Sequence, residues 1–89
     1  MTLTKAASAG TDKAGDLLVW VEPGTSPLQI QLKSSVSDLF GEAILNAVRE
    51  TAASCGVIAG LIRIQDKGAL DYVIRARVET ALHRSGGDA

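Results

Sequence analysis

Residue types that commonly perform catalysis or bind metals are scarce in this sequence. His83 is the only histidine, and it stands near the end of an expected helix, where the helix dipole favours a partly positive imidazole. Cys55 is the only cysteine and has no recognisable partner, so we interpret it as a small buried residue. Asp71 and Arg75 are spaced i, i+4, which is typical of a surface ion pair. We therefore expect no catalytic residue and no metal site.

Other signals of enzymatic or nucleic-acid function are also missing. The sequence contains no phosphate-binding glycine loop and no Ser-His-Asp set, and we interpret Trp20 as a core residue. A formal net charge of −1 disfavours nucleic acid as a partner. No apolar run approaches the roughly 20 residues of a membrane span. One cysteine excludes an internal disulfide and fits a reducing compartment. We expect a cytoplasmic, non-catalytic protein with neither nucleic-acid nor membrane partners.

Hydrophobic periodicity predicts the elements that would position a site. Residues 16–22 are apolar on both faces, which indicates a central strand, and residues 28–33 alternate as a half-buried strand does. Residues 23–27, PGTSP, have turn chemistry, so we expect the two strands to form a hairpin. The later elements are a helix over 35–54 with a Ser35–Asp38 capping box and a C-terminal Gly56, a strand over 57–66, and a helix after Gly68 to about Arg84.

This order of elements predicts an α+β fold. The pattern is strand-strand-helix-strand-helix in a single domain, residues 1–89, with two helices packed on one face of a β-sheet. Residues 1–13 are rich in Ala, Thr and Ser, a composition that suits either an extra edge strand or a loose segment. We expect residues 1–13 and 85–89 to be mobile.

Three stretches resemble the acyl carrier protein, or gamma subunit, of citrate lyase. They are AGTDKAGD at 9–16, VSDLFGEAI at 36–44 and DKGALDYVIRARVETAL at 66–82. The resemblance spans roughly residues 8–84 and keeps the order and spacing of the family. Its most specific part is DKGALD followed by RAR, because no general structural requirement demands these residues in this order.

The resemblance implies a carrier subunit. In the family, a serine is esterified to a phosphoribosyl-dephospho-CoA group, a long arm that ends in a thiol and carries acetyl. The implied partners are the alpha subunit, which exchanges acetyl for citrate, the beta subunit, which cleaves the citryl thioester, and the transferase that attaches the arm. A tether of this kind replaces diffusion between two active sites by a high local concentration.

The sequence departs from the family at the attachment residue, because Ala14 stands at the position of the modified serine. A methyl side chain has no oxygen to hold a phosphodiester, so we expect the arm to be absent from this chain. Either the serine was replaced deliberately, or a natural relative lost the attachment and kept the scaffold. Gly15 would let a bulky arm approach the backbone, or is an ordinary turn glycine. Asp16 would orient the transferase or a magnesium ion, or caps the turn.

The resemblance also suggests a docking surface. We expect the DKGALD corner and the arginines of the second helix to dock an acidic partner surface or the phosphates of the folded-back arm, with a solvated face as the alternative interpretation. These candidate docking residues are Asp66, Lys67, Gly68, Asp71, Arg75 and Arg77. Two other functions stay open: the related carrier of malonate decarboxylase, and a non-carrier scaffold subunit of a lyase-like assembly.

Overall fold

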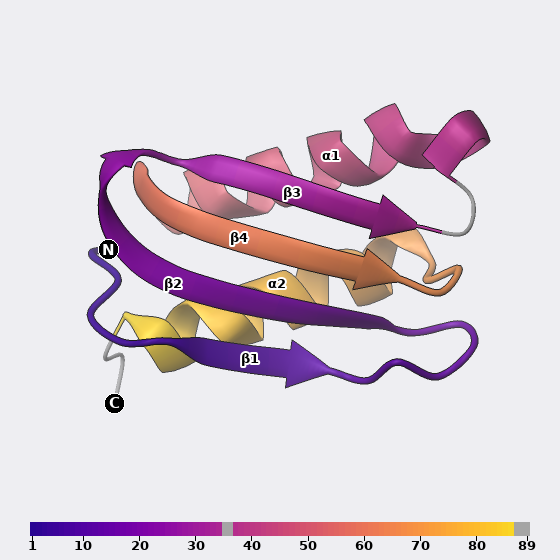
Figure 1. Ribbon diagram of the computed structural model, residues 1–89, viewed down its shortest axis with the longest axis horizontal. Coiled ribbons are helices and arrows are strands. Elements are labelled where there is room, and N and C mark those ends of the chain that lie inside the picture. The colour runs from indigo at the N-terminus through magenta and orange to yellow at the C-terminus, as the bar shows by residue number, and fades with distance from the viewer. Residues whose placement is uncertain (35–36, 87–89) are drawn as a thin grey trace.

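A four-stranded sheet and two helices make up the protein, whose computed structural model describes residues 1–34 and 37–86. The elements are β1 (Ala7–Gly10), β2 (Leu17–Pro27), β3 (Gln29–Ser34), α1 (Ser37–Ser54), β4 (Ala59–Asp66) and α2 (Asp71–Ser85). The strands lie in the order β1-β2-β4-β3, as Figure 1 shows. The α+β class is therefore confirmed.

The predicted hairpin of the second and third strands is wrong. β4 lies between them, antiparallel to β2 and parallel to β3, so that Leu32 and Val19 both pair with Ile64. The middle of β4 is apolar and buried, since Ile62 and Ile64 are 0% and 2% exposed. A strand this apolar is stabilised by a partner on each side, and this preference outweighs the pairing of sequence neighbours.

The segment 23–27 is part of β2 and not a turn, which is the second correction. Its register against β4 shifts between Glu22 and Pro27, so this part of β2 is bulged and leads past the start of β4 toward β3 (Figure 1). Two glycines permit the close passage. A Cβ on Gly60 would lie 2.7 Å from the carbonyl oxygen of Glu22, and one on Gly24 would lie 3.4 Å from the Cα of Gly60.

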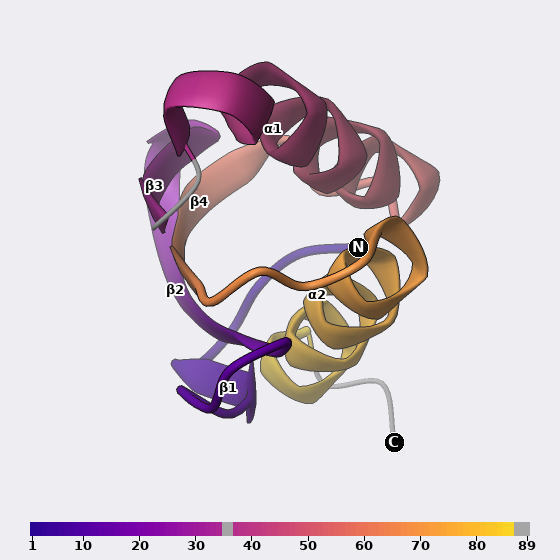
Figure 2. The same ribbon diagram turned by 90° about the vertical axis from the view of Figure 1, so that its right-hand side faces the viewer.

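Both helices cover the same face of the sheet, as predicted (Figure 2). The core between the layers includes Leu17, Val48, Ile62 and Leu82, each 0% exposed. α1 ends as predicted, with Gly56 in the left-handed region at a φ of 71°. The proposed capping residue Ser35 lies outside the described residues.

The N-terminal segment contributes the edge strand β1, the first of the two alternatives for residues 1–13. Leu3 is 6% exposed, and the Thr4 amide donates to the carbonyl of Ser85 at 2.9 Å. The predicted mobility of this segment and of residues 85–89 stays a prediction. Within residues 1–34 and 37–86, neither helix is long and apolar enough to cross a membrane.

Candidate functional site

The loop that joins β1 to β2 carries Ala14 at an exposed position. Thr11, Asp12, Lys13, Ala14 and Gly15 are all exposed, and Asp16 is half-buried. In Figure 1 this loop, the β4–α2 loop and the start of α1 lie at one end of the molecule. Gly15 has a φ of +82° and no heavy atom within 4 Å of a Cβ built on it. The glycine thus provides a backbone shape that other residues rarely adopt, in open surroundings.

Asp16 organises the base of this loop. Its Oδ2 accepts the Thr11 hydroxyl at 2.8 Å, and its Oδ1 accepts the Leu17 amide at 2.8 Å. Arg77 of α2 donates to both carboxylate oxygens, through Nε at 3.2 Å and Nη2 at 3.1 Å. The Thr11 hydroxyl first, then the Leu17 amide and Arg77, lower the pKa of Asp16 to about 2. The side chain is therefore ionised at neutral pH and joins the loop to α2.

The β4–α2 loop closes against the β1–β2 loop. Gly15 donates its amide to the Lys67 carbonyl at 2.7 Å, and the Lys67 amide donates to the Asp16 carbonyl at 2.9 Å. The stretches AGTDKAGD and DKGALD, about fifty residues apart in the sequence, are therefore neighbours in the structure. Together they form one site with Ala14 at its exposed tip.

Asp66 is a buried residue that holds the β4–α2 loop of this site in place. It is 2% exposed, and its carboxylate accepts the Ser34 hydroxyl at 2.9 Å and the amides of Gly68 and Ala69 at 3.1 and 3.0 Å. These bonds fix the turn that Gly68 makes at a φ of +90°. A carboxylate so enclosed shapes the loop and offers little surface to a partner.

The two arginines among the predicted docking residues have different partners. Arg77 bonds Asp16, whereas Arg75 donates to Asp71 at 2.7 Å and across to Glu50 of α1 at 3.0 Å. The bond to Asp71 and then the bond to Glu50 raise the pKa of Arg75. The predicted i, i+4 ion pair of Asp71 and Arg75 is thus confirmed. A docking role for these residues stays a prediction.

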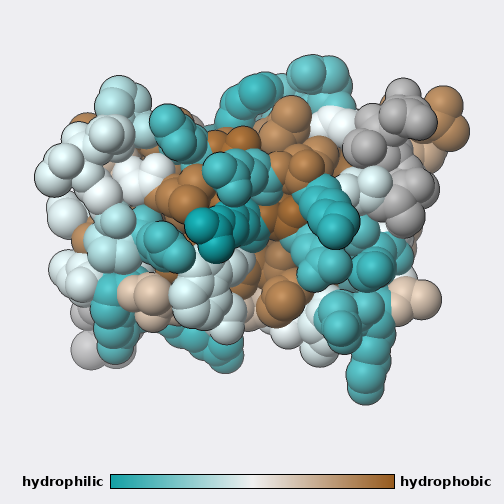
Figure 3. All heavy atoms as spheres, viewed as in Figure 1, coloured by the Kyte–Doolittle hydropathy of each residue, from teal (hydrophilic) through white to brown (hydrophobic). Residues whose placement is uncertain are grey.

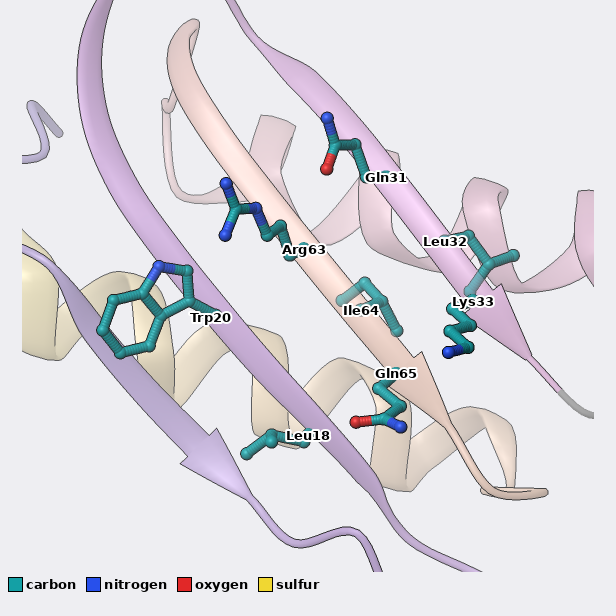
Figure 4. A pocket seen from close by; sticks show the side chains of 8 residues that line it. All are labelled: Leu18, Trp20, Gln31, Leu32, Lys33, Arg63, Ile64 and Gln65. Carbon is teal, nitrogen blue, oxygen red and sulfur yellow. The ribbon is translucent and has the colours of Figure 1, made fainter.

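Trp20 is not a core residue, which corrects the sequence interpretation. It is 39% exposed on the face of the sheet that the helices leave open, and its indole N–H donates to Glu22 at 2.7 Å. A shallow groove of about 590 Å³ crosses this face, lined by Trp20, Arg63 and Lys33 from three strands (Figure 4). In the space-filling view, hydrophobic residues gather at the middle of this face among hydrophilic ones (Figure 3).

The two residue types best suited to catalysis lie elsewhere. Cys55 is half-buried after α1, and desolvation, with the nearby Glu79 carboxylate second, raises the pKa of its thiol. His83 is in the last turn of α2, with its Nε2 3.8 Å from a carboxylate oxygen of Glu79. Among the described residues, no group of three or more His, Cys, Asp or Glu side chains is arranged to hold a metal ion.

The side chain at position 14 is a methyl group, so it has no oxygen that could form an ester and no proton that it could transfer. What the site offers is an exposed position on a firmly held loop. Sequence reasoning had identified Ala14, Gly15 and Asp16 through a resemblance alone. It did not anticipate the bond from Arg77 to Asp16, because local sequence patterns do not indicate a contact between residues 61 positions apart.

Comparisons with known proteins agree on one kind of subunit. Residues 4–85 match the family described as malonate decarboxylase delta subunit (MdcD). The citrate lyase acyl carrier protein of Halothermothrix orenii is 40% identical over 100% of this chain and 95% of that protein. The citrate lyase acyl carrier proteins of Cronobacter sakazakii and of Haemophilus influenzae strain PittEE are 45% and 47% identical, over 96% of this chain and 88% of each.

A solved structure extends the comparison to the fold. A chain in the crystal structure of a Pseudomonas malonate decarboxylase hetero-tetramer in complex with malonate superposes with a TM-score of 0.64. It is 26% identical, and the match covers 97% of this chain and 93% of that one. The two-layer arrangement of sheet and helices is therefore shared with a subunit of a known multi-subunit enzyme.

Proposed function

Because the chain belongs to the family of citrate lyase acyl carrier proteins and malonate decarboxylase delta subunits, we propose that it takes the carrier's place in a citrate lyase complex. The observation that carries this proposal is the exposed tip at Ala14, on a loop fixed at its base by Asp16 and Lys67. A carrier must present one position to other subunits while its scaffold stays rigid. The relatives named citrate lyase acyl carrier protein, at 40–47% identity, support this choice of complex.

The chain as it stands does not fit the prosthetic group at the proposed position. The family attaches the phosphoribosyl-dephospho-CoA group through a serine oxygen, and Ala14 offers only a methyl group. The loop around position 14 is nevertheless held in place, because Gly15 and Asp16 exchange backbone hydrogen bonds with Lys67. We infer an unmodified form of a carrier whose recognition surface is intact.

The test restores the missing oxygen. Ala14→Ser, the unaltered chain and Lys13→Ser are each incubated with the citrate lyase prosthetic-group transferase and its triphosphoribosyl-dephospho-CoA precursor, and intact mass is recorded. Lys13→Ser is the matched control, because it adds the same hydroxyl one residue away in the same exposed loop. We expect the mass of the arm on Ala14→Ser alone. The loaded variant should then support citrate cleavage with the alpha and beta subunits.

Each other result has a distinct meaning. Loading of the unaltered chain would show that another hydroxyl is the attachment point, and loading of Lys13→Ser would show that the transferase does not require position 14. If no variant is loaded, the citrate lyase carrier proposal fails, and a malonate decarboxylase carrier or a non-carrier scaffold subunit replaces it.

A carrier of malonate decarboxylase is the second candidate. It is favoured by the match of residues 4–85 to the delta subunit family and by the solved chain with a TM-score of 0.64. Identity of 26% to that chain, against 40–47% to citrate lyase carriers, places it second. Loading Ala14→Ser and supplying it to each set of subunits separates the two, since only the matching complex should become active.

A further inference from the structure

The face of the sheet that the helices leave open carries an aromatic ring beside two basic side chains. Trp20, Arg63 and Lys33 come from β2, β4 and β3 and line the groove of about 590 Å³ (Figure 4). Trp20 pairs with Arg63 and Arg63 with Gln31, so these three residues form one row across the strands. Gln65 and Lys33 pair in the next row. We call these five residues the open-face site.

The two cations of the open-face site are not neutralised by the chain itself. Arg75 and Arg77 of α2 have carboxylate partners at 2.7 and 3.1 Å. Within residues 1–34 and 37–86, by contrast, neither Arg63 nor Lys33 forms an ion pair or a side-chain hydrogen bond. Both side chains are exposed. The groove therefore presents uncompensated positive charge, which an anionic ligand would complement.

The indole of Trp20 is placed to stack against a flat ligand. The side chain is 39% exposed, and the bond from its ring N–H to Glu22 at 2.7 Å fixes one edge of the ring. In Figure 4, which looks onto the open face with the helices behind it, the ring is seen face on. One face of the indole thus points away from the sheet. Stacking of a nucleic-acid base on such a ring strengthens binding by about fivefold or more.

This combination of groups matches the parts of a single nucleotide. The ring suits the base, the two cations suit two phosphates, and the amides of Gln31 and Gln65 can hydrogen-bond the ribose hydroxyls or the edge of the base. A fatty chain would leave the cations without a partner, and an acidic peptide has no need of the stacking ring. A strand of nucleic acid requires several rings and a longer cationic groove, and the net charge of −1 disfavours it.

We propose that the open-face site binds a purine nucleoside diphosphate, with its base on Trp20 and its phosphates at Arg63 and Lys33. Trp20 and Lys33 lie two strands apart, about 10 Å at the usual strand spacing, so one ligand can reach both. A purine has a larger stacking face than a pyrimidine. Because the groove is shallow and buries only part of a ligand, we expect a dissociation constant on the order of 0.1–1 mM. None of these residues belongs to the β1–β2 loop, so the proposal does not depend on the carrier role.

The test uses the fluorescence of Trp20, which is the only tryptophan and so reports binding at the ring itself. The full chain is titrated with ADP at low ionic strength without divalent cations. Adenosine, which lacks the phosphates, and pyrophosphate, which lacks the base and is detected by its displacement of ADP, are titrated in parallel. We expect saturable quenching by ADP and at least about fivefold weaker binding of each fragment.

Two matched pairs of variants locate the ligand. Arg63→Gln should weaken ADP binding at least about threefold, and Lys33→Gln likewise, whereas Arg49→Gln removes an arginine with 56% of its side chain exposed on α1 and should stay within about twofold. Trp20→Ala, measured by equilibrium dialysis of labelled ADP, should weaken binding at least about fivefold. Its control is Tyr72→Ala, which removes a 70% exposed ring at the start of α2.

Each other outcome overturns the proposal. Quenching that rises linearly without saturation would mean that ADP only collides with the exposed ring. Equal affinity for adenosine and ADP would exclude a role of the cations, and equal affinity of Arg63→Gln and Arg49→Gln would place the ligand elsewhere. Binding of a single-stranded oligonucleotide or an oligo-glutamate peptide more than about tenfold tighter than ADP would identify a polymer as the occupant. The ligand series on the unaltered chain stays decisive if a variant fails to fold. The carrier proposal is tested separately, by intact mass at position 14.

Discussion

Gly10 is the last residue of β1 and precedes the β1–β2 loop that carries Ala14. Substituting it tests quantitatively how the conformation of this loop is maintained. Its φ is +91°, and a Cβ built on it would lie 1.9 Å from the carbonyl oxygen of Leu17. The same oxygen accepts the Thr11 amide at 3.1 Å. Gly10→Ala therefore adds backbone strain of about 1–2 kcal/mol, and the clash with Leu17 disrupts a hydrogen bond at a cost of about 1–2 kcal/mol. We expect the free energy of unfolding to fall by about 2–4 kcal/mol.

Gly15→Ala is the matched control, because it changes the same residue type in the same loop. Its φ of +82° is equally unusual, but no heavy atom lies within 4 Å of the added Cβ. Gly15→Ala should therefore lower the free energy of unfolding only by the cost of the left-handed backbone conformation, about 1–2 kcal/mol. Urea titration gives both free energies, and a loss of 1 kcal/mol corresponds to roughly 4–8 °C in Tm for a chain of this size. Equal losses for the two variants would refute the reasoning that contact with Leu17, rather than φ alone, makes Gly10 necessary.

Two carboxylates of the site yield further predictions. The pKa of Asp16 is lowered from 3.8 to about 2, so its ionised form stabilises the fold above pH 3.8 and this contribution is lost as the pH falls toward 2. Urea titrations at pH 7, 4, 3 and 2 should show a steeper loss of stability below pH 4 for the unaltered chain than for Asp16→Asn, and parallel profiles would contradict the role of Asp16 in joining the loop to α2. Asp66→Ala leaves one hydroxyl and two amides without their acceptor and should cost about 2–4 kcal/mol. Asp66→Asn keeps one acceptor oxygen and should cost less, so equal losses for the two variants would show that these bonds are not what Asp66 contributes.

Local patterns predicted the elements well and their pairing poorly. The helices followed from apolar spacing and from Gly56, and β4 from a run of β-branched and aliphatic residues. The hairpin of residues 16–22 and 28–33 was wrong because PGTSP has the composition of a turn. In the structure that segment extends β2 past the start of β4, since Gly24 and Gly60 let the backbones approach closely. Composition alone cannot report such a tertiary contact.

In the candidate site, too, the residues could be predicted from the sequence but their tertiary contacts could not. The resemblance pointed to Ala14, Gly15 and Asp16, but their joining to Lys67 and Arg77 depends on the antiparallel pairing of β2 with β4. Trp20 alternates with Val19 and Val21, so its strand has two apolar faces, and only the structure shows that the helices cover one of them.

The conformation of the β1–β2 loop does not depend on the side chain of residue 14, and the Ala14→Ser experiment can be interpreted for this reason. Ala14 is exposed, and the hydrogen bonds that shape the loop are made by its neighbours Thr11, Gly15 and Asp16. A serine at position 14 would therefore direct its hydroxyl into solvent, and Ala14→Ser should change the free energy of unfolding by no more than about 0.5 kcal/mol. With folding unchanged, loading of this variant alone can be assigned to the added oxygen. A change in stability of more than about 1 kcal/mol would contradict this, because the side chain at position 14 would then take part in shaping the loop.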